Sequence, residues 1–361
     1  MIITSIKIFS YQLPLALPLS VFGKKLDQRE GLVVQLSCDD GSAGFGEIAP
    51  LFGASKETMD EALKQTLILR ERLWETDLPE DADQLDGKLA EWLNDDKLFS
   101  SVRFGFEMAA LTLLANQDHI SLASLLKLNH DKRVPLNGLL HGKTEAIFEQ
   151  AKIMKDARYQ SVKLKVGGND IQAEIAKTNA VMNIFENSVL LRLDANRNWS
   201  FDQAMQFAEE LGPAVIEYIE EPFKDVDKIP EFYNKTLIPV ALDESIPELS
   251  FDKIKGVDGL EILILKPTIL GGFERAWALL NSAKAAGIRC IISSCFESGL
   301  GIDALANFSA AASQGIPMGL DTLRWFKDDI VDIAPVKNGY YYLPDTPVHD
   351  SLKFDRVKEL T

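Results

Sequence analysis

Apolar and polar positions alternate along the first fifty residues, which is the pattern of half-buried β-strands. Two such stretches cover residues 2–15 and 31–48, and Asp40-Gly41 predicts a hairpin turn inside the second. The segment between them, residues 17–30, is predicted to be a polar loop that carries Gly23, Lys24, Lys25 and Arg29.

Beyond these strands the apolar spacing becomes helical. One helix is predicted to begin near Ser55, because Ser55 and Glu57 precede an apolar rhythm of three and four residues. A second helix is predicted over residues 102–114. Strands and helices together predict a small α+β unit at the N-terminus.

The pattern changes again after residue 130, where short runs of branched apolar residues recur between helical stretches. Eight such runs lie between residues 134 and 322, about one every 27 residues, and a βα unit needs roughly 30. Continuous apolar runs are typical of parallel strands that are buried on both faces. Since no GxGxxG motif opens any helix, a closed (β/α) barrel is favoured over an open sheet.

The expected organisation is therefore an α+β domain over residues 1–125 and a barrel over residues 126–329. A C-terminal segment, residues 330–361, is expected to pack back on the N-terminal domain. Within it, residues 335–344 contain Asn338-Gly339 and predict a last hairpin that packs on that domain rather than on the barrel.

Composition narrows the class of protein. The 361 residues include 38 Lys and Arg against 54 Asp and Glu, a net charge of −16, which argues against binding to nucleic acid or an anionic membrane. The absence of CxxC spacing among Cys38, Cys290 and Cys295 indicates a reducing compartment. With no signal peptide pattern and no membrane-length apolar run, we expect a cytoplasmic protein with a small-molecule partner; its oligomeric state stays open.

Charged residues follow the predicted barrel strands at regular intervals. Lys165, Asp194, Glu220, Asp243 and Lys266 are separated by 29, 26, 23 and 23 residues, close to one βα unit each. The C-terminal ends of the strands form the edge where barrel active sites are built. We therefore expect these side chains to meet at one rim.

The three acids suggest a metal site. Asp194, Glu220 and Asp243 would repel each other without a cation between them, and three carboxylates from three strands suit Mg²⁺. Helix capping by each acid is the alternative. The neighbours Glu221 and Glu244 are not chosen, because alternation turns one of each pair away and Glu221 already enters a turn at Pro222.

The lysines suggest acid–base chemistry. Lys163 and Lys165 lie two residues apart and share a strand face, which near carboxylates is expected to be the barrel lumen, and Lys266 ends the sixth strand at an equivalent height. A lysine among other cations and partly desolvated has a lowered pKa and can act as a base. Structural ion pairing with the same acids is the alternative.

Further polar residues are candidates for substrate contacts. Arg192 and Asn196 share a face with Asp194 on the third strand, and the start of the helix after the seventh strand offers free backbone N–H groups that suit a carboxylate. His141, just past the first barrel strand, is expected near the rim in a surface role. The candidate substrate-binding residues are Lys163, Arg192, Asn196, Ser293, Ser294 and Glu297.

At this point the motifs form a recognisable set. KLK, RLDAN, YIEEP, ALDES and LKP on successive strands resemble the enolase superfamily and its muconate-lactonising branch, and GFGEIAPL and RFGFEMAALTLL resemble its N-terminal capping domain. Within the branch, REG at residues 29–31, SSCFES and GLDTL are most similar to the o-succinylbenzoate synthase family. The resemblance implies a modified TIM barrel of the (β/α)7β type with a capping domain.

It also implies a reaction. Lys165 would abstract the proton α to a carboxylate and return a proton to the departing hydroxyl, in a syn-dehydration that forms o-succinylbenzoate for menaquinone synthesis. Mg²⁺, with Mn²⁺ as an alternative, would be held by Asp194, Glu220 and Asp243 and would stabilise an ene-diolate. Lys163 would keep the pKa of the base low, and Lys266 would be a cationic stabiliser. Residues 17–30 and 51–54 would close over the substrate.

Four alternatives stay open. An N-succinylamino-acid racemase would use the same lysines and metal, whereas a dipeptide epimerase is disfavoured because Asp321-Thr322-Leu323 lacks the second acid of its Asp-x-Asp motif. A Schiff-base aldolase that uses Lys266 and a non-catalytic ligand-binding barrel belong to other classes. The retained charges argue against the last, because burying them is costly.

Overall fold

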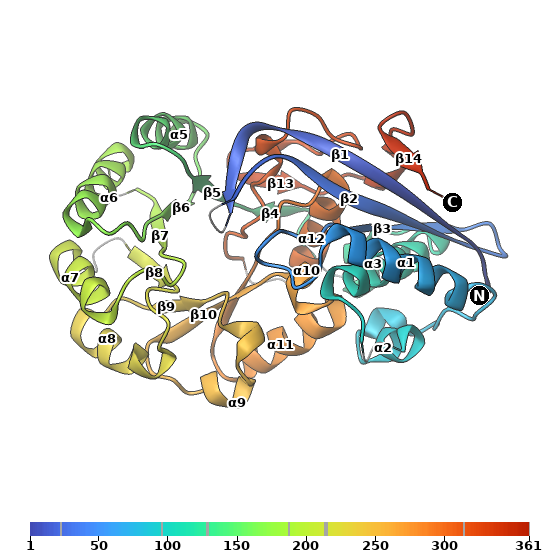
Figure 1. The fold of residues 1–361 in the computed structure, drawn as a ribbon, viewed down its shortest axis with the longest axis horizontal. Coiled ribbons are helices and arrows are strands. Elements are labelled where there is room, and N and C mark those ends of the chain that lie inside the picture. Colours follow the sequence, from blue (N-terminus) through green and yellow to red (C-terminus); the bar gives the residue numbers. More distant parts are fainter. Residues whose placement is uncertain are drawn as a thin grey trace.

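The computed structural model describes residues 1–21, 24–94, 97–127, 130–186, 188–212, 216–312 and 315–360. An antiparallel sheet with its helices lies beside a barrel of parallel strands (Figure 1). The fold class predicted from the sequence, an α/β barrel of the (β/α)7β type with an N-terminal α+β domain, is confirmed. None of the helices in the described ranges is long and apolar enough to cross a bilayer.

The N-terminal sheet has the strand order β14-β1-β2-β3. Its strands are β1 (Ile3–Val21), β2 (Lys24–Cys38), β3 (Ala43–Ile48) and, from the C-terminus, β14 (Val357–Glu359). Its helices are α1 (Met59–Leu73), η1 (Ala82–Gln84), α2 (Lys88–Leu93), α3 (Ser100–Gln117) and α4 (Leu122–Leu126). The predicted helix over residues 102–114 lies within α3.

The sheet packs closely on α3 because of its glycines. A Cβ added to Gly46 of β3 would lie 1.8 Å from the carbonyl oxygen of Gly105 on α3, so only glycine fits there. The GFGE motif therefore marks the place where the backbone of a strand touches the backbone of a helix.

Two local predictions for this domain are wrong. The polar loop expected over residues 17–30 is instead part of a long hairpin, in which Leu19 pairs with Leu26 and Val21 with Lys24; Gly23 lies outside the described residues. Its polar side chains lie on strands with an exposed face, which is why composition suggested a loop. Helix α1 starts at Met59, not near Ser55, because Thr58 and Glu61 form a reciprocal capping box.

The barrel sheet has the strand order β11-β10-β9-β8-β7-β6-β5, all parallel. Its strands are β5 (Asn137–Leu140), β6 (Ser161–Lys165), β7 (Leu190–Asp194), β8 (Ile216–Glu220), β9 (Val240–Leu242), β10 (Leu260–Leu265) and β11 (Arg289–Ile292). The helical segments between and after them are α5 (Thr144–Asp156), α6 (Ile171–Phe185), α7 (Phe201–Leu211), η2 (Val226–Lys228), α8 (Ile229–Thr236), η3 (Ile246–Glu248), α9 (Phe251–Ile254), α10 (Pro267–Leu270), α11 (Phe273–Ala285) and α12 (Gly299–Ala312).

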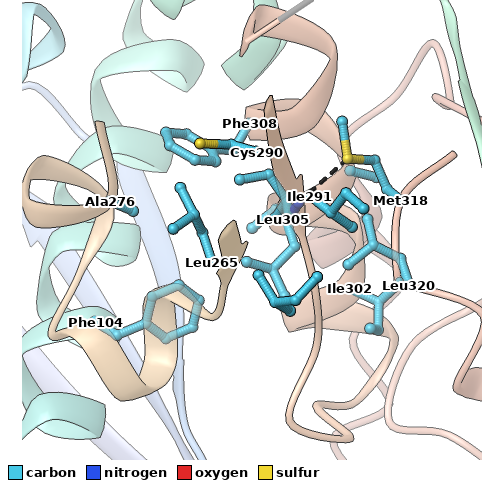
Figure 2. Packing of buried hydrophobic residues seen from close by; sticks show 14 of the residues in the cluster. Phe104, Leu265, Ala276, Cys290, Ile291, Ile302, Leu305, Phe308, Met318 and Leu320 are labelled. Atoms are coloured by element: carbon cyan, nitrogen blue, oxygen red, sulfur yellow. Dashed lines mark hydrogen bonds between the residues drawn. The ribbon is translucent and has the colours of Figure 1, made fainter. Parts of the chain in front are cut away.

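The eighth predicted strand is reduced to two isolated parallel bridges, Leu136–Met318 and Ser293–Gly319. Main-chain hydrogen bonds from Gly319 to Ile292 and from Asn137 to Met318 join both edges of the seven-stranded sheet to this segment. Nearby, apolar side chains of β10, β11, α11, α12 and α3 form a continuous core (Figure 2).

The C-terminal segment is divided between the two domains. The hairpin of β12 (Val336–Lys337) and β13 (Tyr340–Tyr342) pairs with β4 (Arg133–Pro135) at the start of the barrel, so its predicted packing on the N-terminal domain is wrong. The Tyr340 ring stacking on the guanidinium of Arg133 favours this placement. Beyond η4 (Leu323–Trp325) and η5 (Val348–Ser351), β14 joins the N-terminal sheet along β1.

Candidate active site

Six charged residues lie at the C-terminal ends of five neighbouring barrel strands. Lys163 and Lys165 belong to β6, Asp194 and Glu220 are the last residues of β7 and β8, and Asp243 and Lys266 directly follow β9 and β10. Lys165 is in register with Asp194, and Asp194 with Glu220. Because the parallel strands are in register, residues that are regularly spaced in the sequence lie at the same level of the rim.

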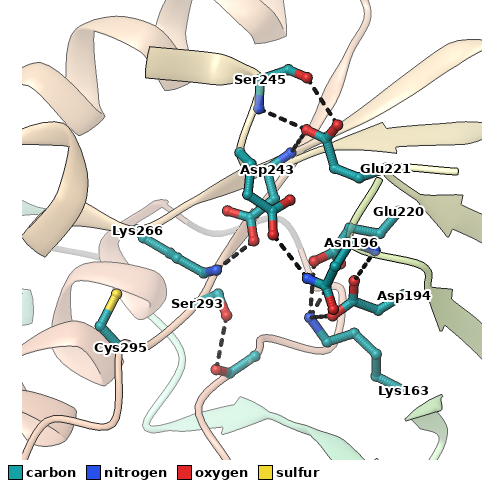
Figure 3. A network of polar contacts seen from close by, with 12 residues as sticks. Lys163, Asp194, Asn196, Glu220, Glu221, Asp243, Ser245, Lys266, Ser293 and Cys295 are labelled. Carbon is teal, nitrogen blue, oxygen red and sulfur yellow. Dashed lines mark hydrogen bonds and ion pairs between the residues drawn. The ribbon is translucent and has the colours of Figure 1, made fainter. Parts of the chain in front are cut away.

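The lysines approach the acids from two sides (Figure 3). Lys163 Nζ lies 3.1 Å from both carboxylate oxygens of Glu220 and 3.6 Å from Asp194 Oδ2. Lys165 Nζ lies 3.6 Å from the same Asp194 oxygen and donates to Asn196 Oδ1 at 2.7 Å. On the other side, Lys266 is paired with Asp243.

This pairing sets the protonation of the lysines. Although burial opposes it, Glu220 and Asp194 raise the pKa of Lys163 above the usual lysine value. Asp243 does the same for the pKa of Lys266, again against burial. The lowering expected for a lysine among other cations is therefore wrong for these two, because their nearest neighbours are carboxylates.

Burial and the neighbouring lysines have opposite effects on the pKa values of the acids. Burial, together with Asp194 and Asp243, raises the pKa of Glu220 well above the usual glutamate range, although Lys163 opposes this. Burial also acts to raise the pKa of Asp194, but Lys165 and Lys163 outweigh it and hold that pKa below the ordinary value. The site thus holds closely spaced carboxylates whose charge depends on the cations beside them.

The two neighbouring acids differ in what they contact. Glu221 turns away from the lumen at φ 45° and accepts hydrogen bonds from the N–H groups of Asp243 and Ser245 and from Arg197. Glu244 stays near the site, where its Oε1 accepts from Asn196 Nδ2 at 2.8 Å. Its Oε2 is buried and has no hydrogen-bond partner among the described residues.

These residues fit a divalent ion in their chemistry. The acids Asp194, Glu220, Asp243 and Glu244 outnumber the three lysines, and Glu244 Oε2 is a buried oxygen without a hydrogen-bond partner in the described part of the chain. Carboxylate oxygens are what Mg²⁺ and Mn²⁺ prefer. Several of these carboxylate oxygens are directed at lysines. In the described ranges, no three His, Cys, Asp or Glu side chains lie close enough together to hold a metal ion.

Arg192 does not reach this rim. Its fully buried guanidinium donates to Glu217 at 2.7 Å, to Asn137 at 2.8 Å and to the carbonyl oxygen of Pro317 at 2.6 Å. Its expected contact with substrate is therefore not supported: it shares a face with Asp194 but points toward residues at the N-terminal starts of β5 and β8. Asn196, in contrast, lies in the site between Lys165 and Glu244.

The start of α12 also differs from the expectation. The N–H groups of Ser298 and Gly301 donate to Glu47 of β3, and that of Gly299 donates to Asp329. Glu297 is bonded to Thr268 Oγ1 at 2.5 Å and to the N–H of Cys295 at 2.6 Å. These N–H groups are not free for a substrate carboxylate, because buried acids already occupy them.

Ser293 and Ser294 contact the eighth-strand segment. Ser293 Oγ donates to the carbonyl oxygen of Gly319 at 3.2 Å, and Ser294 Oγ lies 2.9 Å from Thr322 Oγ1. Ser293 lies beside the charged cluster in Figure 3, and a substrate contact there stays a prediction. His141 directly follows β5 and is half-buried, and burial together with the charge of Lys165 lowers its pKa.

Two buried residues of the N-terminal sheet, Arg29 and Glu47, are 3% and 0% exposed and are not among the candidate site residues predicted from the sequence. Both contact the segment that follows β11, Arg29 at Cys295 and Phe296 and Glu47 at Ser298. The available signal was a charged residue on a largely apolar strand, which is seldom buried without a partner.

Two family models match the chain. The one described as "Enolase C-terminal domain-like" matches residues 146–347, and "MenC, N-terminal domain" matches residues 3–113. The o-succinylbenzoate synthase of Vibrio cholerae is 32% identical over 332 residues, which cover 89% of this chain and 90% of that protein. The chloroplastic protein PHYLLO of Arabidopsis thaliana is 29% identical, and the match covers 84% of this chain and a fifth (20%) of PHYLLO.

Solved structures share the fold. The muconate lactonizing enzyme of Pseudomonas fluorescens superposes with a TM-score of 0.86 at 22% identity, covering 98% of this chain and 97% of that one. An N-succinyl Arg/Lys racemase of Bacillus cereus superposes with a TM-score of 0.85 at 21% identity, covering 96% and 94%. At these identities the likeness is one of architecture.

Proposed function

The chain belongs to the o-succinylbenzoate synthase family of the enolase superfamily, and from this membership we propose that it dehydrates 2-succinyl-6-hydroxy-2,4-cyclohexadiene-1-carboxylate to o-succinylbenzoate. The reaction is a step of menaquinone synthesis, carried out in the cytoplasm. The observation that supports the proposal is that Lys165 lies beside Asp194 and Lys266 is paired with Asp243, at the rim formed by the ends of β6 to β10.

Lys165 is the base in this proposal. Its side chain is 39% exposed, against 13% for Lys163 and 23% for Lys266, so it is the lysine most open to a bound molecule. It takes the proton α to the substrate carboxylate, and the electron pair of that C–H bond forms the new ring double bond as the hydroxyl departs. The same lysine returns the proton to the hydroxyl, which leaves as water on the same face.

The other residues bind and orient. Mg²⁺, when bound by Asp194, Glu220 and Asp243, supplies positive charge beside the substrate carboxylate. Lys266 adds a fixed positive charge on the opposite side of the site, and Asn196 orients Lys165 through its hydrogen bond. The hairpin of β1 and β2 covers the substrate together with residues 51–54, where Lys24 already lies 4.4 Å from the centre of the Phe52 ring.

N-succinylamino-acid racemisation is the second candidate. It is favoured by the same two-sided arrangement, because Lys165 and Lys266 can each exchange a proton with one face of an α-carbon. A Schiff-base aldolase is not favoured by the family membership, which rests on o-succinylbenzoate synthase relatives.

The test is direct. Purified protein with Mg²⁺ and the cyclohexadiene acid should show aromatisation by ultraviolet absorbance, and chelation should stop it. N-succinylamino acids, followed by polarimetry in parallel, provide the comparison. No aromatisation together with fast racemisation would replace the proposed function by the second candidate.

A further inference from the structure

One buried arginine of the N-terminal sheet bridges three segments that are distant in sequence. Arg29 of β2 donates from Nη1 to the carbonyl oxygen of Pro50 at 3.0 Å and from Nη2 to that of Ala49 at 2.9 Å, both after β3. The same guanidinium donates from Nε to Phe296 at 3.1 Å and from Nη2 to Cys295 at 3.3 Å, in the loop after β11. All four acceptors are main-chain carbonyl oxygens, so the planar fork of Arg29 holds backbone to backbone.

The loop after β11 is in turn bonded to the segment that carries Lys266. The N–H of Cys295 donates to Glu297 Oε2 at 2.6 Å, and Thr268 Oγ1 donates to Glu297 Oε1 at 2.5 Å. Thr268 lies two residues after Lys266, on α10. Cys295 lies beside Lys266 in Figure 3. A continuous set of hydrogen bonds thus runs from the N-terminal sheet to the neighbourhood of one of the site lysines.

The backbone of this loop needs such support. Phe296 has φ +59°, in the left-handed region that residues with a side chain adopt at a cost. Strained positions of this kind persist only where surrounding contacts fix them. Arg29 contacts the carbonyl groups on both sides of this residue's Cα, those of Cys295 and Phe296.

We propose that Arg29 is a positioning residue, through which the N-terminal domain fixes the loop after β11 and, by way of Glu297 and Thr268, the place of Lys266. The inference rests on the proposed function for its kinetic consequence. Because the donors of Arg29 are bonded to main-chain carbonyls and its side chain is buried, it acts through the loop rather than on a bound molecule.

The experiment compares Arg29→Met with Arg103→Met, the removal of an equally buried arginine from α3 (3% exposed in both cases) that is paired with Glu107 and Glu274. We expect Arg29→Met to lower kcat by about 10²-fold with KM changed by less than about threefold, since a displacement near 1 Å has effects of this size. Amide hydrogen exchange at residues 293–298 should become faster. Arg103→Met should lower Tm and leave kcat within about twofold and exchange in the loop unchanged.

An unchanged kcat in folded Arg29→Met, or equal losses in both variants, would overturn the proposal. If Arg29→Met does not fold, Thr268→Val breaks the same connection at its other end. It should lower kcat about tenfold, together with a decrease in Tm because the buried Glu297 loses a donor, and a normal kcat would count against the proposal. If the wild-type protein does not dehydrate the cyclohexadiene acid, the proposed function fails by itself. Loop exchange then still decides: unchanged exchange in Arg29→Met overturns the inference.

Discussion

Two clusters of buried charge in this molecule differ in how their charges are satisfied. Between α3 and α11, Arg103 lies 2.5 Å from Glu107 and 2.9 Å from Glu274, and Glu274 also accepts from the N–H groups of Gly87, Leu89 and Ala90. At the barrel rim, carboxylates face mainly lysines, and one Glu244 oxygen has no partner in the described part of the chain. The first cluster joins two domains, whereas the second lies at the rim where the active site is proposed.

The largest effect is expected from Lys165→Ala. Loss of the proposed base should reduce turnover at least about 10³-fold, because proton abstraction then falls to water or to a misplaced group. The variant should fold, since Lys165 is partly exposed and sits at the end of its strand. Steady-state kinetics measure the turnover, and circular dichroism measures whether the variant is folded. Substantial residual turnover would remove Lys165 as the base.

Glu274→Ala probes the joining cluster. Removing this carboxylate leaves Arg103 with one ion-pair partner fewer and three N–H groups without an acceptor, so the free energy of unfolding should fall by about 3–5 kcal/mol. Activity per folded molecule should remain. Urea unfolding and kinetics at low temperature separate the two quantities. A selective loss of kcat at normal stability would erase the contrast between the clusters.

Asp243→Asn probes the rim as a metal site. Replacing one charged ligand by a neutral amide should weaken Mg²⁺ binding by about 10- to 100-fold in calorimetry. Glu221→Gln is the matched control, because Glu221 is bonded to backbone and to Arg197 instead of facing the lumen. Equal Mg²⁺ affinity in Asp243→Asn and the wild type would contradict the ligand assignment.

The smallest effect concerns pH. Burial raises the pKa of Glu107 to about 7 from its ordinary 4.5, although Arg103 opposes this. The folded state therefore holds a proton that the unfolded state releases, and stability falls by about 2–3 kcal/mol as pH rises from 4.5 to 7. Glu107→Gln should flatten the dependence of Tm on pH in this window. An unchanged slope would show that Glu107 titrates normally.

The features of the site that the sequence predicts follow from the spacing of residues along the chain. The βα period brings Asp194, Glu220 and Asp243 to one rim, because parallel strands in register end at the same level. The alternation of side chains along a strand predicts which face of the sheet a residue lies on, but not how far it lies from the rim of the barrel. Arg192 therefore shares a face with Asp194 and yet contacts Glu217, near the start of β8.

What could not be predicted depends on contacts between remote segments. The N–H groups at the start of α12 are occupied by Glu47, more than 250 residues earlier in the chain, and no local pattern reveals that partner. The polar composition of residues 17–30 predicts a loop, although these residues belong to the β1–β2 hairpin and Leu19 is buried. Tertiary pairing decides such segments.

The most direct test of the account is a crystal structure of the protein soaked with Mn²⁺, examined by anomalous scattering. We predict a single strong peak at the rim, with oxygens of Asp194, Glu220 and Asp243 about 2.0–2.5 Å from it and Lys165 and Lys266 on opposite sides. A peak elsewhere, or an ion that leaves these carboxylates paired with lysines, would contradict the account.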